Sequence, residues 1–176
     1  MQYGISSEGF DNLEDVIMLL NNMTSKSTKI SSHCWNFLSP LVDVVVGLEE
    51  DLKQFVADKN SPSDFQGLGF EMLDRISIIF MNFIIRDPET FLTGVDNKGR
   101  SFLMRTMYMI ERVIFIGTNK KDELDNCHAV KILIALFESC KGKIDNLLEN
   151  FLKFLLDNLK KAKAVYYKII IIQAVT

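Results

Sequence analysis

Apolar residues recur every three or four positions along most of this chain, and polar stretches separate the segments in which they do so. Such spacing puts the apolar side chains on one face of a helix. It predicts helices over residues 12–24, 32–57, 65–86, 101–116, 123–140, 145–162 and 165–176. The last segment holds four consecutive isoleucines, which favour a strand in isolation, but we expect a helix because every preceding element is helical.

Proline and glycine mark where these helices bend or stop. Pro40 lies inside the helix expected over 32–57 and should kink it, because proline lacks the backbone N–H and clashes with the preceding turn. Asp87 and Pro88 should end the third helix and lead into one short turn. Trp35 lies on the apolar face of the second helix, which favours a core position over an interface anchor. The predicted fold class is all-α.

The order helix, turn, helix repeats along the chain, with alternate helices beginning near residues 12, 65, 123 and 164. This gives an irregular period of about 40 to 58 residues, longer where loops are inserted. HEAT-type repeats have periods of roughly 40 to 47 residues, and their helix pairs stack into an α-solenoid. A helical bundle fits the same pattern. We expect residues 1–176 to form a single HEAT-repeat segment of about three antiparallel helix pairs plus one further helix. Because the sequence ends inside an apolar helix, we expect a piece of a longer solenoid.

Composition and charge narrow the class of protein. A hydrophobic content of 48% is typical of a chain with a folded core, and a net charge of −3 gives no indication of a nucleic-acid partner. Residues 1–99 carry 15 acidic and 7 basic side chains, whereas residues 100–176 carry 8 and 13. This asymmetry either steers a charged partner or reflects solvated helix faces. Neither a secretory signal nor a membrane-spanning run is apparent, so we expect a soluble intracellular protein without membrane insertion.

No catalytic or metal-binding constellation is visible in the sequence. His33 and His128 each neighbour a cysteine, but adjacent helical side chains point about 100° apart and make no natural dyad. Cys34, Cys127 and Cys140 lack zinc-site spacing, and we expect reduced thiols, at least two of them buried. No glycine-rich phosphate loop is present. These observations predict a protein that is not an enzyme and holds no cofactor or metal.

One polar stripe is the candidate binding site. Its members follow one another at spacings of seven, seven and four in the helix expected over 32–57, which puts them on one helix face: Asn36, Asp43, Glu50 and Gln54. Acidic groups in a row on a rigid scaffold attract basic partners. The alternative is a helix face that is only solvated.

Residues 126–159, NCHAVKILIALFESCKGKIDNLLENFLKFLLDNL, are the most distinctive part of the chain. They resemble the importin-β (karyopherin-β) superfamily of nuclear transport receptors, and within it the importin seven and importin eight branch. Members of that branch carry a similar CHAxKLLxxxxxxCKG followed by IDxxxxxF. The matching positions are Cys127, His128, Ala129, Lys131, Leu133, Cys140, Lys141, Gly142, Ile144, Asp145 and Phe151. Weaker likenesses lie at residues 14–45 and 87–97, in the same order.

The resemblance implies a fold and a set of partners. These receptors are HEAT-repeat superhelices that bind protein cargo, including basic proteins, on their inner surface. They bind phenylalanine-glycine nucleoporins, and their N-terminal repeats, which this chain lacks, bind the GTPase Ran. The implied locations are the cytoplasm, the nucleus and the nuclear pore, and no cofactor is implied. No family binding residue maps onto this sequence. The alternative function is another non-catalytic α-solenoid scaffold or adaptor in trafficking or signalling.

Overall fold

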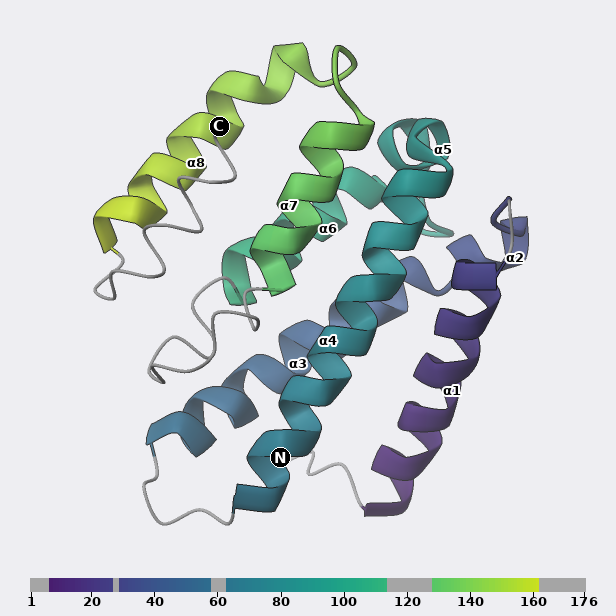
Figure 1. Cartoon of the computed structure of the whole chain (residues 1–176), viewed down its shortest axis with the longest axis vertical. Coiled ribbons are helices and arrows are strands. Elements are labelled where there is room, and N and C mark those ends of the chain that lie inside the picture. The colour runs from purple at the N-terminus through teal and green to yellow at the C-terminus, as the bar shows by residue number, and fades with distance from the viewer. Residues whose placement is uncertain (1–6, 27–28, 58–62, 114–127, 162–176) are drawn as a thin grey trace.

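The computed structural model describes residues 7–26, 29–57, 63–113 and 128–161, and helices dominate these ranges (Figure 1). The elements are α1 (Ser7–Lys26), α2 (Ser32–Trp35), α3 (Leu38–Ala57), α4 (Ser63–Arg86), α5 (Pro88–Thr93), α6 (Phe102–Val113), α7 (His128–Ser139), the 3-10 helix η2 (Asp145–Leu147) and α8 (Leu148–Lys161). Across these ranges the only β-type pairing is an isolated bridge between Val95 and Ser101. The all-α prediction is confirmed, and the helix predicted over 165–176 lies outside the described residues.

The prediction of one kinked helix over 32–57 is wrong, because the chain breaks at Asn36 and Phe37 into α2 and α3. Pro40 falls in the first turn of α3, a position where a helix needs no donor from that residue. The amide of Leu41 donates to the carbonyl of Phe37 at 2.9 Å, which starts the ladder of the new helix. A proline that would kink a continuous helix therefore begins a second one here.

The helices form two layers. The helices α1, α4 and α7 lie side by side with α4 in the middle, and they run in the same direction (Figure 1). Behind them, α3 and α6 form the second layer and run in the opposite direction (Figure 1). α3 packs on α6 and also on α4 of the first layer. The last of the described helices, α8, meets α7 through an edge-to-face contact of Phe151 with Phe137, whose ring centroids are 5.5 Å apart.

An aromatic cluster joins the two layers. The ring of Trp35, at the end of α2, lies 4.5 Å from the ring of Phe83 on α4 and 5.1 Å from that of Phe102 on α6. Only 6% of Trp35 is exposed, and Phe83 is fully buried. Aromatic rings at these separations attract one another beyond the area they bury. The prediction that Trp35 belongs to the core is confirmed.

Polar contacts fix the register of α1 on α4. Arg75 donates to Glu14 at 2.8 Å near the middle of α1, and Asn82 donates to the buried hydroxyl of Thr24 at 3.2 Å near its end. The Thr24 hydroxyl in turn donates to the carbonyl of Leu20 at 2.9 Å. A buried hydroxyl that both donates and accepts a hydrogen bond has its loss of water contacts offset, so this pair fixes the position of α1 along α4 at little energetic cost.

Cys34 and Cys140 are buried free thiols, and burial raises the pKa of both. The prediction that at least two of the three cysteines are buried is confirmed. Cys127 lies outside the described residues.

Candidate protein-binding surface on α3 and α6

The polar stripe expected on one helix divides between two elements. Asn36 caps α2 and is exposed in the turn before α3, so it does not share a helix with the other three. Asp43 lies in the second turn of α3 with 60% of its side chain exposed. Glu50 and Gln54 belong to α3, but their side chains lie outside the described part of the chain. Among the described side chains, Asp43 is therefore the acidic group of this stripe on the surface.

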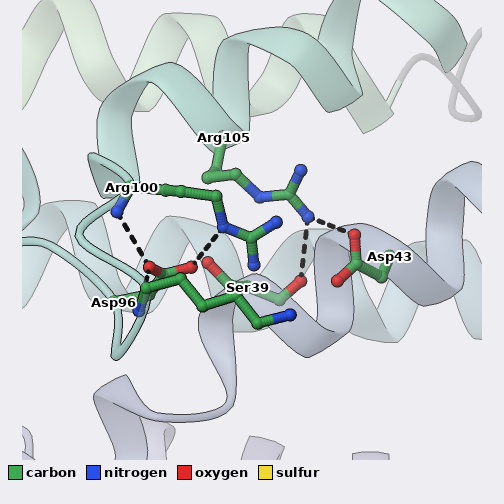
Figure 2. Close-up of polar contacts among 6 residues, drawn as sticks. Ser39, Asp43, Asp96, Arg100 and Arg105 are labelled. Carbon is green, nitrogen blue, oxygen red and sulfur yellow. Dashed lines mark hydrogen bonds and ion pairs between the residues drawn. The ribbon is translucent and has the colours of Figure 1, made fainter.

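Asp43 is bound to an arginine of the neighbouring helix. Nη2 of Arg105, on α6, donates to Oδ1 of Asp43 and to the backbone carbonyl of Ser39 at 3.3 Å (Figure 2). The Arg105 side chain is only 13% exposed, and its Nε is buried without a hydrogen-bond partner. The guanidinium therefore clamps the first turns of α3 onto α6, and among the described residues it donates only to Oδ1 of the Asp43 carboxylate.

Asp96 holds together the turn that precedes α6. Asp96 is 5% exposed and accepts from the amides of Lys98 and Arg100, each at 2.9 Å, and from Nε of Arg100 at 2.7 Å (Figure 2). Burial opposes ionisation of Asp96, but the hydrogen bonds from Arg100 and Lys98 outweigh it and hold the pKa of the carboxyl well below its usual range. Gly99 takes the left-handed conformation with φ +73° that closes this turn.

Apolar and aromatic side chains flank the ion pair. Tyr108 is 44% exposed and Met104 is 64% exposed, both on α6 and within one turn of Arg105. The Arg105 guanidinium lies 6.0 Å from the Tyr108 ring centroid. Gly47, one turn after Asp43, is exposed and leaves the α3 backbone open to close approach. Protein interfaces are enriched in tyrosine, methionine and arginine, so this composition suits protein contact.

Arg105, Met104 and Tyr108 cannot be recognised as members of this surface from the sequence pattern. Arg105 and Asp43 are 62 positions apart, so no local spacing links them. The strong amphipathic pattern of α6 predicts which face is buried, but it leaves open which exposed residues adjoin Asp43.

The described ranges offer neither a metal site nor a membrane span. There, no three His, Cys, Asp or Glu side chains gather where they could hold a metal ion. In the same ranges, none of the helices has the length and apolar character needed to span a bilayer.

Comparison with known proteins adds one distant relative. The Importin beta-like SAD2 homolog of Arabidopsis thaliana is 21% identical over 175 residues, a match that covers 99% of this chain. The likeness supports a relationship to the importin-β superfamily. It does not show that the chain belongs to the importin seven and importin eight branch, which residues 126–159 resemble. The chain spans 15% of the length of this relative. No family model and no solved structure matches the chain.

Proposed function

We propose that this chain is a non-catalytic, protein-binding segment of a nuclear transport receptor that carries protein cargo between cytoplasm and nucleus. The observation that supports this most is the likeness to an importin-β-like protein, which extends over 99% of the chain. That likeness favours a transport receptor over another solenoid scaffold. The proposed branch is that of importin seven and importin eight.

The packing of the helices supports an α-solenoid. Within the described ranges, α1, α4 and α7 form one row of parallel helices, and α3 and α6 form a second row of opposite direction. Stacked helix pairs give this arrangement, because each pair buries its apolar face against the next. A closed bundle instead surrounds one central core with antiparallel neighbours.

The cargo surface of this segment is proposed to lie on α3 and α6 around Asp43. Its carboxylate is exposed, no described residue donates to its second oxygen, and Tyr108 and Met104 on α6 supply apolar contact area. A basic side chain with an apolar neighbour matches this chemistry. Glu50 and Gln54 remain predicted members of the same surface, whereas Asn36 lies in the turn before α3.

The proposed receptor carries its Ran-binding repeats outside this chain and uses phenylalanine-glycine nucleoporins to pass the pore. Antibodies raised against the chain test this in extracts of the source cells. They should co-precipitate Ran when the extract is supplied with a non-hydrolysable GTP analogue, and little or no Ran when it is supplied with GDP. Equal recovery of Ran in both nucleotide states, or none in either, contradicts the assignment to a transport receptor.

A further inference from the structure

Arg105 occupies the two groups of the proposed surface that an arginine of a partner would use. Its Nη2 donates to Oδ1 of Asp43, and no described residue donates to Oδ2 of that carboxylate. Its Cζ lies 6.0 Å from the centroid of the Tyr108 ring, within the range at which an aromatic face attracts a cation. One carboxylate oxygen and one face of the ring therefore already meet a guanidinium from the chain itself.

The surrounding protein holds the Arg105 side chain in this position. Only 13% of the side chain is exposed, and Nη2 also donates to the backbone carbonyl of Ser39 at 3.3 Å, in the first turn of α3 (Figure 2). Loss of Asp43 would leave a mostly buried charge unpaired, on a guanidinium whose Nε already lacks a hydrogen-bond partner among the described residues. A partner that approaches the 60% exposed Asp43 therefore meets a carboxylate that keeps its own arginine.

Occupation of Oδ1 changes which cation the surface prefers. Arginine normally binds a carboxylate more firmly than lysine does, because its planar fork donates to both oxygens and its plane stacks on aromatic rings. Lysine carries a compact ammonium that needs only one oxygen. Building on the proposed cargo surface, without which this step has no basis, we infer that a partner donates to Oδ2 of Asp43 through lysine. Arg105 is then the specificity-determining residue, because it excludes the forked contact of an arginine.

Two peptides of equal length and charge test this choice, one alternating serine with lysine and the other serine with arginine. Titrated into the full 176-residue chain at about 0.01 M ionic strength, they should bind the wild type with affinities within about twofold of each other. Arg105→Gln opens both oxygens of Asp43 to the partner, so it should raise the affinity for the arginine peptide about fivefold more than that for the lysine peptide. The matched control is Arg75→Gln, which removes the same charge from the ion pair with Glu14 and should leave the ratio of the two affinities unchanged. A fivefold or greater preference of the wild type for the arginine peptide, or an unchanged ratio in Arg105→Gln, overturns the inference.

A conservative variant separates this role from a structural one. Arg105→Lys keeps a cation beside Asp43, so it should keep the wild-type ratio of affinities, whereas a general disturbance of the fold would not distinguish the two peptides. Circular dichroism establishes that each variant is folded. An arginine preference in Arg105→Lys equal to that in Arg105→Gln contradicts the role given to Arg105.

Asp43→Asn distinguishes failure of the lysine preference from failure of the proposed surface. It should weaken the binding of both peptides. If it does so while Arg105→Gln leaves the ratio unchanged, the cargo surface stands and the choice of lysine is overturned. If it weakens neither peptide, the proposed surface itself is contradicted, and the role of Arg105 with it.

Discussion

Arg105 on α6 binds Asp43 on α3 through one guanidinium nitrogen, and the two ends of this ion pair differ sharply in exposure. The arginine side chain is 13% exposed and the aspartate side chain 60%. Asp43→Asn should therefore reduce the free energy of unfolding by less than about 1 kcal/mol, because exposed ion pairs are screened by water. Arg105→Ala should reduce it by about 1 to 3 kcal/mol, because it also removes a packed stem. Urea denaturation measures both values, and equal losses contradict this division of roles.

Trp35 should be the costliest single truncation among the residues that join the two layers. It touches Phe83 and Phe102, and Trp35→Ala leaves a cavity between α4 and α6. The expected loss of stability is about 3 to 5 kcal/mol. Phe37→Ala is the control, because Phe37 lies two residues away and is 42% exposed, and it should cost clearly less, about 1 kcal/mol. Far-ultraviolet circular dichroism follows unfolding in both variants, and similar losses would show that Trp35 is not central to the core.

Two glycines should respond in opposite directions to the same substitution. A Cβ at Gly94 would lie 2.5 Å from the carbonyl oxygen of Thr90 and 2.8 Å from the ring of Phe102, so Gly94→Ala should destabilise the fold by about 1 to 3 kcal/mol. A Cβ at Gly47 would meet nothing within 4 Å, so Gly47→Ala should stabilise α3 by about 0.5 to 1 kcal/mol. Thermal melts of the two variants check the signs, and a shift in the same direction for both contradicts the prediction.

Asp96 should make the stability of the chain depend on acid pH. Its pKa is lowered in the folded state, because hydrogen bonds from Arg100 and Lys98 outweigh the effect of burial. The contribution is complete above the unfolded pKa of about 3.9 and is lost as the pH falls from there toward the folded pKa. Asp96→Asn should therefore lower stability at neutral pH, and the gap to wild type should shrink in acid. A gap that stays constant between neutral and acid pH contradicts the cause given for the lowered pKa.

The helical part of the fold is predictable because it rests on local spacing. The apolar pattern places a helix over 65–86, and α4 occupies Ser63–Arg86. The pair Asp87 and Pro88 predicts the short α5, where Asp87 caps the helix by accepting from the amide of Thr90. Both results follow from propensities and caps that act within a few residues.

The binding surface is less predictable because it depends on contacts between distant segments. Pro40 indicates an irregularity in the helix expected over 32–57. Whether that helix kinks or ends and starts again depends on the packing of Trp35 against Phe83 on α4 and Phe102 on α6. Asp43 can be recognised as a polar position on α3, whereas its pairing with Arg105 requires α3 and α6 to lie side by side. Spacing within one helix carries no information on that neighbour.

The central claim is that the surface around Asp43 binds basic protein, and the binding of a core histone to the full chain tests it most directly. The variant Asp43→Asn is compared with Glu14→Gln, since both acids pair with an arginine. Glu14 pairs with Arg75 within the layer of α1 and α4, away from Asp43 on α3. Titrations at about 0.01 M and about 0.15 M ionic strength change the screening length from about 30 Å to about 8 Å. Asp43→Asn should weaken binding about fivefold at low salt, as expected for an exposed pair worth up to about 1 kcal/mol, and less at high salt. Glu14→Gln should bind like the wild type, and equal affinity of Asp43→Asn and wild type at low salt contradicts the account.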